Sequence, residues 1–289
     1  MTPPAGVPIL MYHQISEARR TGRGRDEGGN ASRPGRLAVP ADRFAAQLDR
    51  LAEGGFATVT AGELASASAA GRPLRRSVVL TFDDGFADFH HRALPLLLSH
   101  GFTATLFVTT GWVGQPAGLP GPGGDHGRSL HVRPRPGQML TRTQLAEVAS
   151  AGIEIGAHSH GHPALDGIPG PVMARELADS KAILEDWLGQ AVPGMAYPFG
   201  YSNERVRRAT AAIGHRYACG VGNRLAGQAP DLHDLPRLTI RRSTRTSDFE
   251  EIINGLHISR HYRADRSLTR AWAAVRRGRA AVRGMGRDV

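Results

Sequence analysis

Short apolar segments of β-strand character alternate with amphipathic helical segments along most of this chain. The segment 77–82 (SVVLTF) is a continuous β-branched and apolar run, which is typical of a strand covered on both faces. The segment 40–53 instead spaces Phe44, Leu48 and Leu51 by four and three residues, as one face of a helix does. About seven or eight such units predict an α/β barrel, with a doubly wound open sheet as the alternative.

The full pattern gives an ordered set of expected elements. Strands are expected at 7–12, 56–59, 77–82, 103–109, 153–157, 194–197, 216–221 and 238–240, and helices at 40–53, 61–70, 86–100, 141–151, 171–188, 203–213 and 247–256. Thr141 is the expected cap of its helix. Two Gly-rich segments interrupt the pattern, an Arg/Gly-rich loop at 19–36 and a Gly/Pro-rich insertion at 111–137.

The composition excludes several classes of protein. A chain of 289 residues that is 40% hydrophobic and 21% charged can bury a sizeable core, so it is neither disordered nor collagen-like. No apolar run approaches the roughly 20 residues of a spanning helix, and no secretory signal is visible at the N-terminus, which together predict a cytoplasmic location. The single cysteine, Cys219, excludes an internal disulfide and a thiolate zinc cluster.

The net charge of +10 is concentrated in two segments. Segment 19–36 carries +4 and segment 260–289 carries +7, so the rest of the chain is almost neutral. Because no recognition motif or aromatic–basic interleaving accompanies this charge, we expect no nucleic-acid partner. Within the tail, 268–282 is basic and moderately amphipathic; it is expected to pack on the domain, with weak contact to an anionic membrane surface as the alternative.

Two adjacent carboxylates, Asp83 and Asp84, directly follow the predicted strand 77–82, within the sequence TFDDG. Asp and Gly together are also common in turns, so a structural interpretation is available. Adjacent carboxylates repel one another, however, unless a cation offsets their charge. The pair therefore favours a metal site or a proton-transfer role.

Three histidines, His158, His160 and His162, follow the predicted strand 153–157. An extended chain would place all three on one face, and a helical turn would bring His158 and His162 together. Two imidazoles and one carboxylate form the open three-ligand site of catalytic zinc, which leaves a position for water. The sequence therefore favours metal binding here. A third segment, 196–200 (AYPFG), is a strand and turn that gains meaning only beside the other two.

The sequences TFDDG, HSHGH and YPFG, in this order, resemble those of the polysaccharide deacetylases of carbohydrate esterase family 4. The opening VPILMYHQIS and the stretch ALPLLLSHGFTATLFV are similar to the branch that acts on poly-N-acetylglucosamine. The resemblance covers about residues 7–249. It implies a distorted (β/α) barrel of about seven strands in a single catalytic domain, 1–260 with its core at about 76–245, followed by a basic helical tail at 261–289.

The resemblance also implies a role for individual residues. Asp83 takes the position of the general base, and Asp84, His158 and His162 take the positions of the metal ligands. The usual metal of the family is Zn²⁺, with other divalent ions possible. The backbone N–H of Phe199 takes the position that stabilises the oxyanion.

The sequence departs from the family pattern at two roles. The family takes its general acid from a histidine in a late Leu-x-His motif, which neither His257 nor His261 matches cleanly; His13, after the first strand, is the better candidate. The arginine that orients the base in the family is replaced here by Ala196. The motif leaves His160 without a specified role.

The function implied is a metal-dependent hydrolase that removes N-acetyl groups from an N-acetylated amino sugar or polysaccharide. A catalytically degenerate member that binds glycan without hydrolysing it is the alternative, favoured by the missing arginine and the uncertain acid. A metal hydrolase that uses His158 and His160 as an H-x-H pair is less consistent with the sequence, because such sites follow the first strand of their barrel.

Overall fold

The computed structural model describes residues 6–17, 35–114, 139–227 and 230–265. Most of the expected loops at 19–36 and 111–137 and the expected tail helix at 268–282 lie outside these ranges. The expectations for those segments, and the division of the chain at residue 260, stay predictions.

The main sheet is entirely parallel. Its strands are β1 (Ile9–Tyr12), β4 (Ala57–Val59), β5 (Ser77–Phe82), β6 (Thr105–Val108), β7 (Glu154–Ala157), β8 (Gly194–Ala196), β9 (Tyr217–Cys219) and β10 (Leu238–Thr239). The spatial order is β10-β1-β5-β6-β7-β8-β9, with β4 paired to the start of β5. An isolated parallel bridge joins Cys219, on β9, to Leu235, which precedes β10 in the chain. The expected distorted (β/α) barrel of about seven strands in one domain is confirmed.

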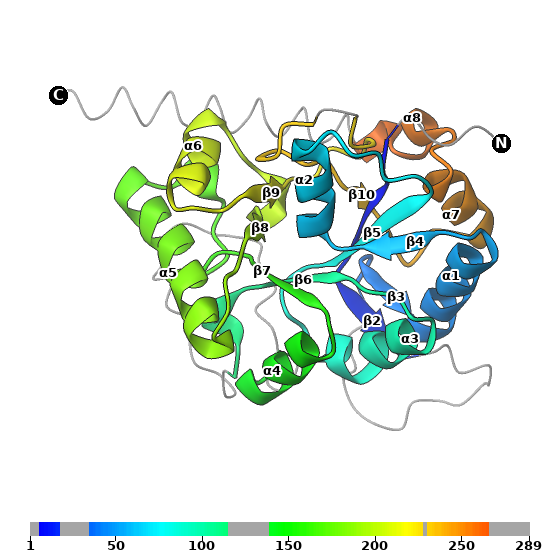
Figure 1. The fold of residues 1–289 in the computed structure, drawn as a ribbon, viewed down its shortest axis with the longest axis horizontal. Coiled ribbons are helices and arrows are strands. Elements are labelled where there is room, and N and C mark those ends of the chain that lie inside the picture. The colour runs from blue at the N-terminus through cyan, green and yellow to red at the C-terminus, as the bar shows by residue number, and fades with distance from the viewer. Residues whose placement is uncertain (1–5, 18–34, 115–138, 228–229, 266–289) are drawn as a thin grey trace.

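Helices surround this sheet (Figure 1). They are α1 (Ala41–Glu53), α2 (Ala61–Ala69), α3 (Leu94–Ser99), α4 (Arg142–Ser150), α5 (Gly170–Leu188), α6 (Glu204–Ala212), α7 (Thr246–Ile253) and α8 (Ile258–His261). Thr141 caps α4 as expected, accepting a hydrogen bond from the Gln144 N–H at 3.2 Å. None of the helices described is long and apolar enough to cross a membrane.

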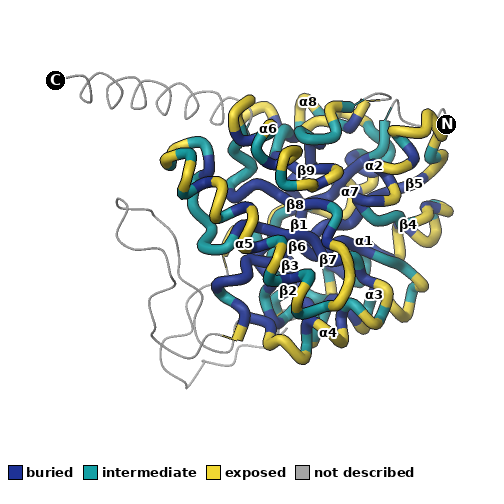
Figure 2. The backbone as a smooth tube through the Cα atoms, turned by 60° about the vertical axis from the view of Figure 1, so that its left-hand side comes forward, coloured by how far each residue is buried: buried dark blue, intermediate teal, exposed yellow. Residues whose placement is uncertain are grey.

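The buried residues form two clusters on opposite faces of the sheet. The larger one fills the space between the strands and the surrounding helices and includes Leu10 and Leu80. The smaller one lies inside the barrel and includes Ile9, Val79 and Phe107. Neighbouring residues of one strand therefore belong to different clusters, as the two-residue period of a strand requires. The strands run through the dark, buried centre of the molecule in Figure 2.

Two local features differ from the sequence expectation. The single helix expected at 86–100 is a π-helix, η1 (Phe89–Ala93), followed by α3. Pro95, at the start of α3, has no N–H to donate, so the regular α-helical hydrogen bonds cannot continue through this turn. In addition, β2 (Gln14–Ser16) and β3 (Ala38–Pro40) form a short parallel pair that was not expected.

Candidate active site

The neighbouring strands β1 and β5 bring His13 and Asp83 to the same edge of the sheet. In the parallel register of β1 and β5, Ile9 pairs with Val79 and Met11 with Thr81. His13 and Asp83 follow one pleat later, and the Asp83 N–H donates to the Tyr12 carbonyl at 3.1 Å. The period of the strand therefore directs both side chains to the inner face, at the carboxyl end where barrel enzymes place their chemistry.

A strained turn separates the two adjacent aspartates. Asp84 has a φ of 79°, in a region that residues other than glycine rarely adopt. Gly85 follows with a φ of 87°, and a Cβ atom there would lie only 3.2 Å from Val108 Cγ1. Because of this turn, the Asp84 carboxylate points towards β7 while Asp83 points into the barrel.

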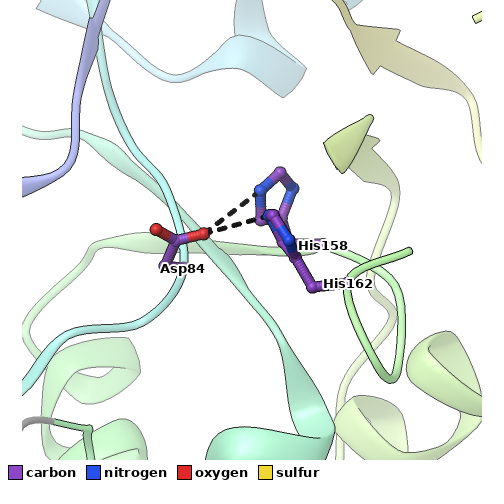
Figure 3. A group of neighbouring side chains, drawn as sticks. All are labelled: Asp84, His158 and His162. Atoms are coloured by element: carbon purple, nitrogen blue, oxygen red, sulfur yellow. Dashed lines mark ion pairs between the residues drawn. The ribbon is translucent and has the colours of Figure 1, made fainter. Parts of the chain in front are cut away.

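Asp84, His158 and His162 converge on one point (Figure 3). Asp84 Oδ1 lies 3.5 Å from His158 Nε2 and 3.3 Å from His162 Nε2. Tetrahedral ligands bound to zinc at about 2.0–2.2 Å are separated by about 3.3–3.6 Å, so this donor set fits Zn²⁺ or a similar divalent ion. The predicted ligands are thus brought together, and Asp83 and His160 are not part of this group.

The orientation of His158 suits a metal ligand. Its Nδ1 lies 2.8 Å from the Ala196 carbonyl, and this hydrogen bond orients the ring so that Nε2 faces Asp84 Oδ1. Burial acts to raise the pKa of Asp84, but the neighbouring His158 and His162 imidazoles outweigh it and hold the pKa well below its usual range. The Asp84 carboxylate is therefore ionised and available to a cation.

Backbone strain and several hydrogen bonds shape the loop that carries the histidines. Ser159 and His162 both have a φ of 60°, and Ser159 Oγ accepts from the His162 N–H at 2.9 Å. The carboxylate of Glu176, on α5, accepts from the Gly161 N–H at 2.7 Å. His160 Nδ1 instead lies 2.9 Å from Thr110 Oγ1, so its side chain anchors this loop to the neighbouring one. Such strained positions persist only where the surroundings hold them in place.

Asp83 is held by an arginine that the sequence analysis missed. Arg237 Nη1 and Nη2 lie 2.6 and 2.8 Å from the two carboxylate oxygens of Asp83. The same guanidinium donates to Thr81 Oγ1 at 3.2 Å and, through Nε, to the Gly220 carbonyl at 3.0 Å. Ala196 stands at the position where the motif comparison expects an arginine, and Arg237 instead reaches Asp83 from the segment before β10, with β1 between β10 and β5.

The charge of Arg237 controls the ionisation of Asp83. Burial acts to raise the pKa of Asp83, but the charge and hydrogen bonds of Arg237 outweigh it, so the pKa is lowered. Arg237 lies 154 residues from Asp83, on the approach to β10, and no local pattern marks it. Only its position as a lone arginine just before a predicted strand could have suggested an inward-facing side chain.

Of the acid candidates, His13 is the one beside the carboxylates. Its Nδ1 is buried and makes no hydrogen bond within the described part of the chain. Burial lowers the pKa of His13, while the charges of Asp84 and Asp83 oppose that shift. His257 and His261 instead contact Glu251, at 3.2 and 2.7 Å.

Aromatic rings line one side of the three-residue group. The His162 ring lies 4.9 Å from the ring of Trp112 and 4.6 Å from that of Phe199, measured between centroids. Tyr201 continues this wall, 5.8 Å from Phe199. Phe199 itself has a φ of 60° in the turn after β8, so its backbone, like that of Asp84 and His162, is strained.

Comparisons with known proteins agree with this architecture. A family model described as polysaccharide deacetylase matches residues 70–218, about half of the chain. The Bacillus subtilis protein YxkH, whose name assigns it to the polysaccharide deacetylases, is 28% identical over 254 residues, which cover 88% of this chain and 78% of YxkH. The poly-β-1,6-N-acetyl-D-glucosamine N-deacetylase of Escherichia coli K12 is 30% identical over 117 residues, which cover 39% of this chain and 17% of that enzyme.

A solved structure extends the similarity to the whole fold. The deacetylase PplD of Streptococcus pyogenes, solved in complex with acetate, is 27% identical and superimposes with a TM-score of 0.69. The match covers 87% of this chain and 99% of PplD. The family resemblance that the three sequence motifs carried is thereby confirmed. The chain belongs to the polysaccharide deacetylase family and is a hydrolase of the N-deacetylase type.

Proposed function

We propose that this chain removes N-acetyl groups from a glycan or amino sugar of the N-acetylglucosamine type, using a divalent metal held by Asp84, His158 and His162. The observation that carries the proposal is the position of this three-ligand group beside the Arg237–Asp83 ion pair. The name of the E. coli relative, which states poly-N-acetylglucosamine as its substrate, supports the choice of sugar. Zn²⁺ is the metal that the donor set favours.

Each residue of the site has a separate role in amide hydrolysis. A divalent metal held by Asp84, His158 and His162 would supply Lewis acidity towards the amide carbonyl and towards water. Asp83, kept ionised by Arg237, accepts a proton from the attacking water as the general base. Arg237 is a positioning residue, because it holds the carboxylate at both oxygens and leaves its proton-accepting lone pairs in a fixed direction.

The leaving amine needs a proton, because an amide anion is a very poor leaving group. We assign this general acid to His13, which follows the strand next to that of Asp83. Burial lowers the pKa of His13, and the charges of Asp84 and Asp83 act against that shift, in favour of the protonated form that a general acid needs. The backbone N–H of Phe199, beside His162, is assigned to the developing oxyanion.

The alternative was a member that binds glycan without hydrolysing it. One argument for it was the absence of the family arginine at Ala196. Arg237 supplies a guanidinium to Asp83 by a different route, so that argument loses its force. The catalytic proposal is therefore the better supported of the two.

The direct test measures acetate released from N-acetylglucosamine oligomers by the zinc-loaded protein, with a chelated sample as control. Chelator-sensitive acetate release is expected. Asp83→Asn should reduce turnover by at least about 100-fold while keeping the zinc, whereas Asp84→Asn should lose both turnover and the zinc held at this site. Zinc bound without acetate release from any oligomer would favour the binding alternative, and no zinc at all would overturn the site.

A further inference from the structure

A second pair of histidines, which has no part in the proposed active site, lies on the outer side of the barrel. His90 and His91 are neighbours on the π-helix η1, and their Nδ1 atoms lie 3.3 Å apart. The two rings are nearly perpendicular, at 89°, with centroids 5.0 Å apart. Consecutive residues of an α-helix do not face each other. The wider turn of the π-helix therefore allows these two neighbouring side chains to face each other.

The outer nitrogen of each ring is held by α4. His90 Nε2 lies 2.6 Å from the Glu147 carboxylate, and His91 Nε2 lies 3.1 Å from the Gln144 side-chain amide. A histidine that binds metal through one nitrogen almost always engages the other in a hydrogen bond, often to a carboxylate. Glu147 fixes the His90 proton on Nε2 and leaves the Nδ1 lone pair pointing at His91.

The separation of the two Nδ1 atoms suits a shared ion. Two imidazoles bound to zinc at about 2.0–2.1 Å in a tetrahedral site lie about 3.3–3.4 Å apart. His91 is exposed and His90 is partly exposed, so water can complete the coordination. We propose that His90 and His91 form a second, surface site for a borderline divalent cation such as Zn²⁺, Ni²⁺ or Cu²⁺, the ions that imidazole favours.

Cation binding requires a defined proton shift. Without the ion, one hydrogen bond joins the two Nδ1 atoms, with the proton supplied by His91. For the ion to bind both lone pairs, the His91 proton moves to Nε2, where water accepts it in place of the hydrogen bond from the Gln144 side-chain nitrogen, because the Gln144 oxygen accepts from the Thr141 N–H at 2.9 Å. The ion then ties η1 more firmly to α4, since it strengthens the His90 to Glu147 hydrogen bond.

The test counts zinc bound per chain by equilibrium dialysis. The wild-type protein is expected to bind two ions, the second more weakly, and His91→Ala to bind one while keeping its melting temperature without zinc and its acetate release. His257→Ala is the matched control, because His257 and His261 are also two nearby histidines, and both contact the Glu251 carboxylate. It should still bind two.

Two results would overturn the proposal: a His91→Ala protein that binds as many ions as the wild type, or loss of an ion in His257→Ala. A second readout is thermal stability, since zinc beyond the first equivalent should raise the melting temperature of the wild type but not of His91→Ala. The proposal does not depend on hydrolysis. A protein that releases no acetate should still show the second ion.

Discussion

Arg237 and Asp83 form a two-point ion pair inside the barrel, with side chains 0% and 4% exposed. Both carboxylate oxygens are engaged, at 2.6 and 2.8 Å. The guanidinium also lies over the Phe107 ring, 5.5 Å from its centroid, so the cation is enclosed by packed groups. A charge that is buried this completely is tolerated only because its partner is present.

Removing the arginine should therefore affect both folding and ionisation. Arg237→Met leaves the Asp83 carboxylate buried and unpaired, and we expect a loss of about 3–5 kcal/mol in the free energy of unfolding. The pKa of Asp83 should rise, so the acid limb of the pH profile of kcat/KM should move to higher pH. Urea unfolding and acetate release at several pH values measure the two effects.

Arg237→Lys keeps the charge but not the two-point geometry, so the pH profile should move less than in Arg237→Met. Arg208→Met is the control, since Arg208 is an exposed residue whose ion pair with Glu204 is exposed as well. An Arg237→Met protein with the wild-type pH profile would show that the arginine does not tune Asp83.

His13→Gln tests the assignment of the general acid. Loss of the proton donor should lower kcat for N-acetylated sugars by about 10²–10⁴-fold, with little change in KM. An aryl acetate such as 4-nitrophenyl acetate has a leaving group that needs no proton, so its hydrolysis should be largely retained. Equal losses on both substrates would mean that His13 has another role, such as holding Asp83 or the metal.

Glu176→Gln tests how the histidine loop is held. The Glu176 carboxylate accepts from the Gly161 N–H, and a neutral amide is a weaker acceptor at this strained turn. We expect zinc affinity to fall by about 10–100-fold, as for other residues that support metal ligands. Competition with a zinc chelator measures the affinity. Asp179→Asn, an exposed position on the same helix, should leave it unchanged; an equal fall there would contradict a specific role for Glu176.

His215 should make the protein sensitive to acid. It is 2% exposed, and burial, with Lys181 nearby, lowers its pKa to about 4. The unfolded chain takes up the proton near pH 6.5, before the folded chain does. The contribution of neutral His215 to the free energy of unfolding is therefore fully present above pH 6.5. It is lost as the pH falls to about 4, by up to about 3 kcal/mol.

Urea unfolding between pH 7 and pH 4 checks this prediction, and His215→Phe should flatten the dependence. His100→Phe is the control with the opposite sign, because the hydrogen bond to Asp49 raises the pKa of His100 and its contribution is lost as the pH rises. An unchanged acid dependence in His215→Phe would assign the sensitivity to other groups.

Much of the secondary structure was predictable because each element buries a face with its own period. Segment 77–82 was expected as a strand covered on both sides, and β5 has these bounds with every residue buried. The interruption at η1 was not foreseen, since Phe89 and Leu94 fit a continuous helix and only Pro95 marks the break. Helix propensity and hydrophobic periodicity do not indicate whether a single turn has α-helical or π-helical hydrogen bonds.

The site was predictable where its residues are local in sequence. Asp84, His158 and His162 each follow a strand, and parallel strands bring their carboxyl ends to one edge, so their convergence follows from topology. Arg237 was not predicted, because the residue that it contacts, Asp83, is distant in sequence. The contact depends on the pairing of β10 with β1.

The amino-acid sequence by itself determined the alternation of strands and helices and the four acidic and imidazole side chains at the ends of β5 and β7, because these depend on short-range periodicity and spacing. The family followed from the resemblance of three short motifs, which are also local in sequence. Only the tertiary structure decided which cation neutralises Asp83 and which histidine lies beside it. Both depend on the register between strands and on the side of the strand that faces the barrel. The register decides which residue a side chain such as Arg237 contacts, and it depends on segments that are far apart in the chain.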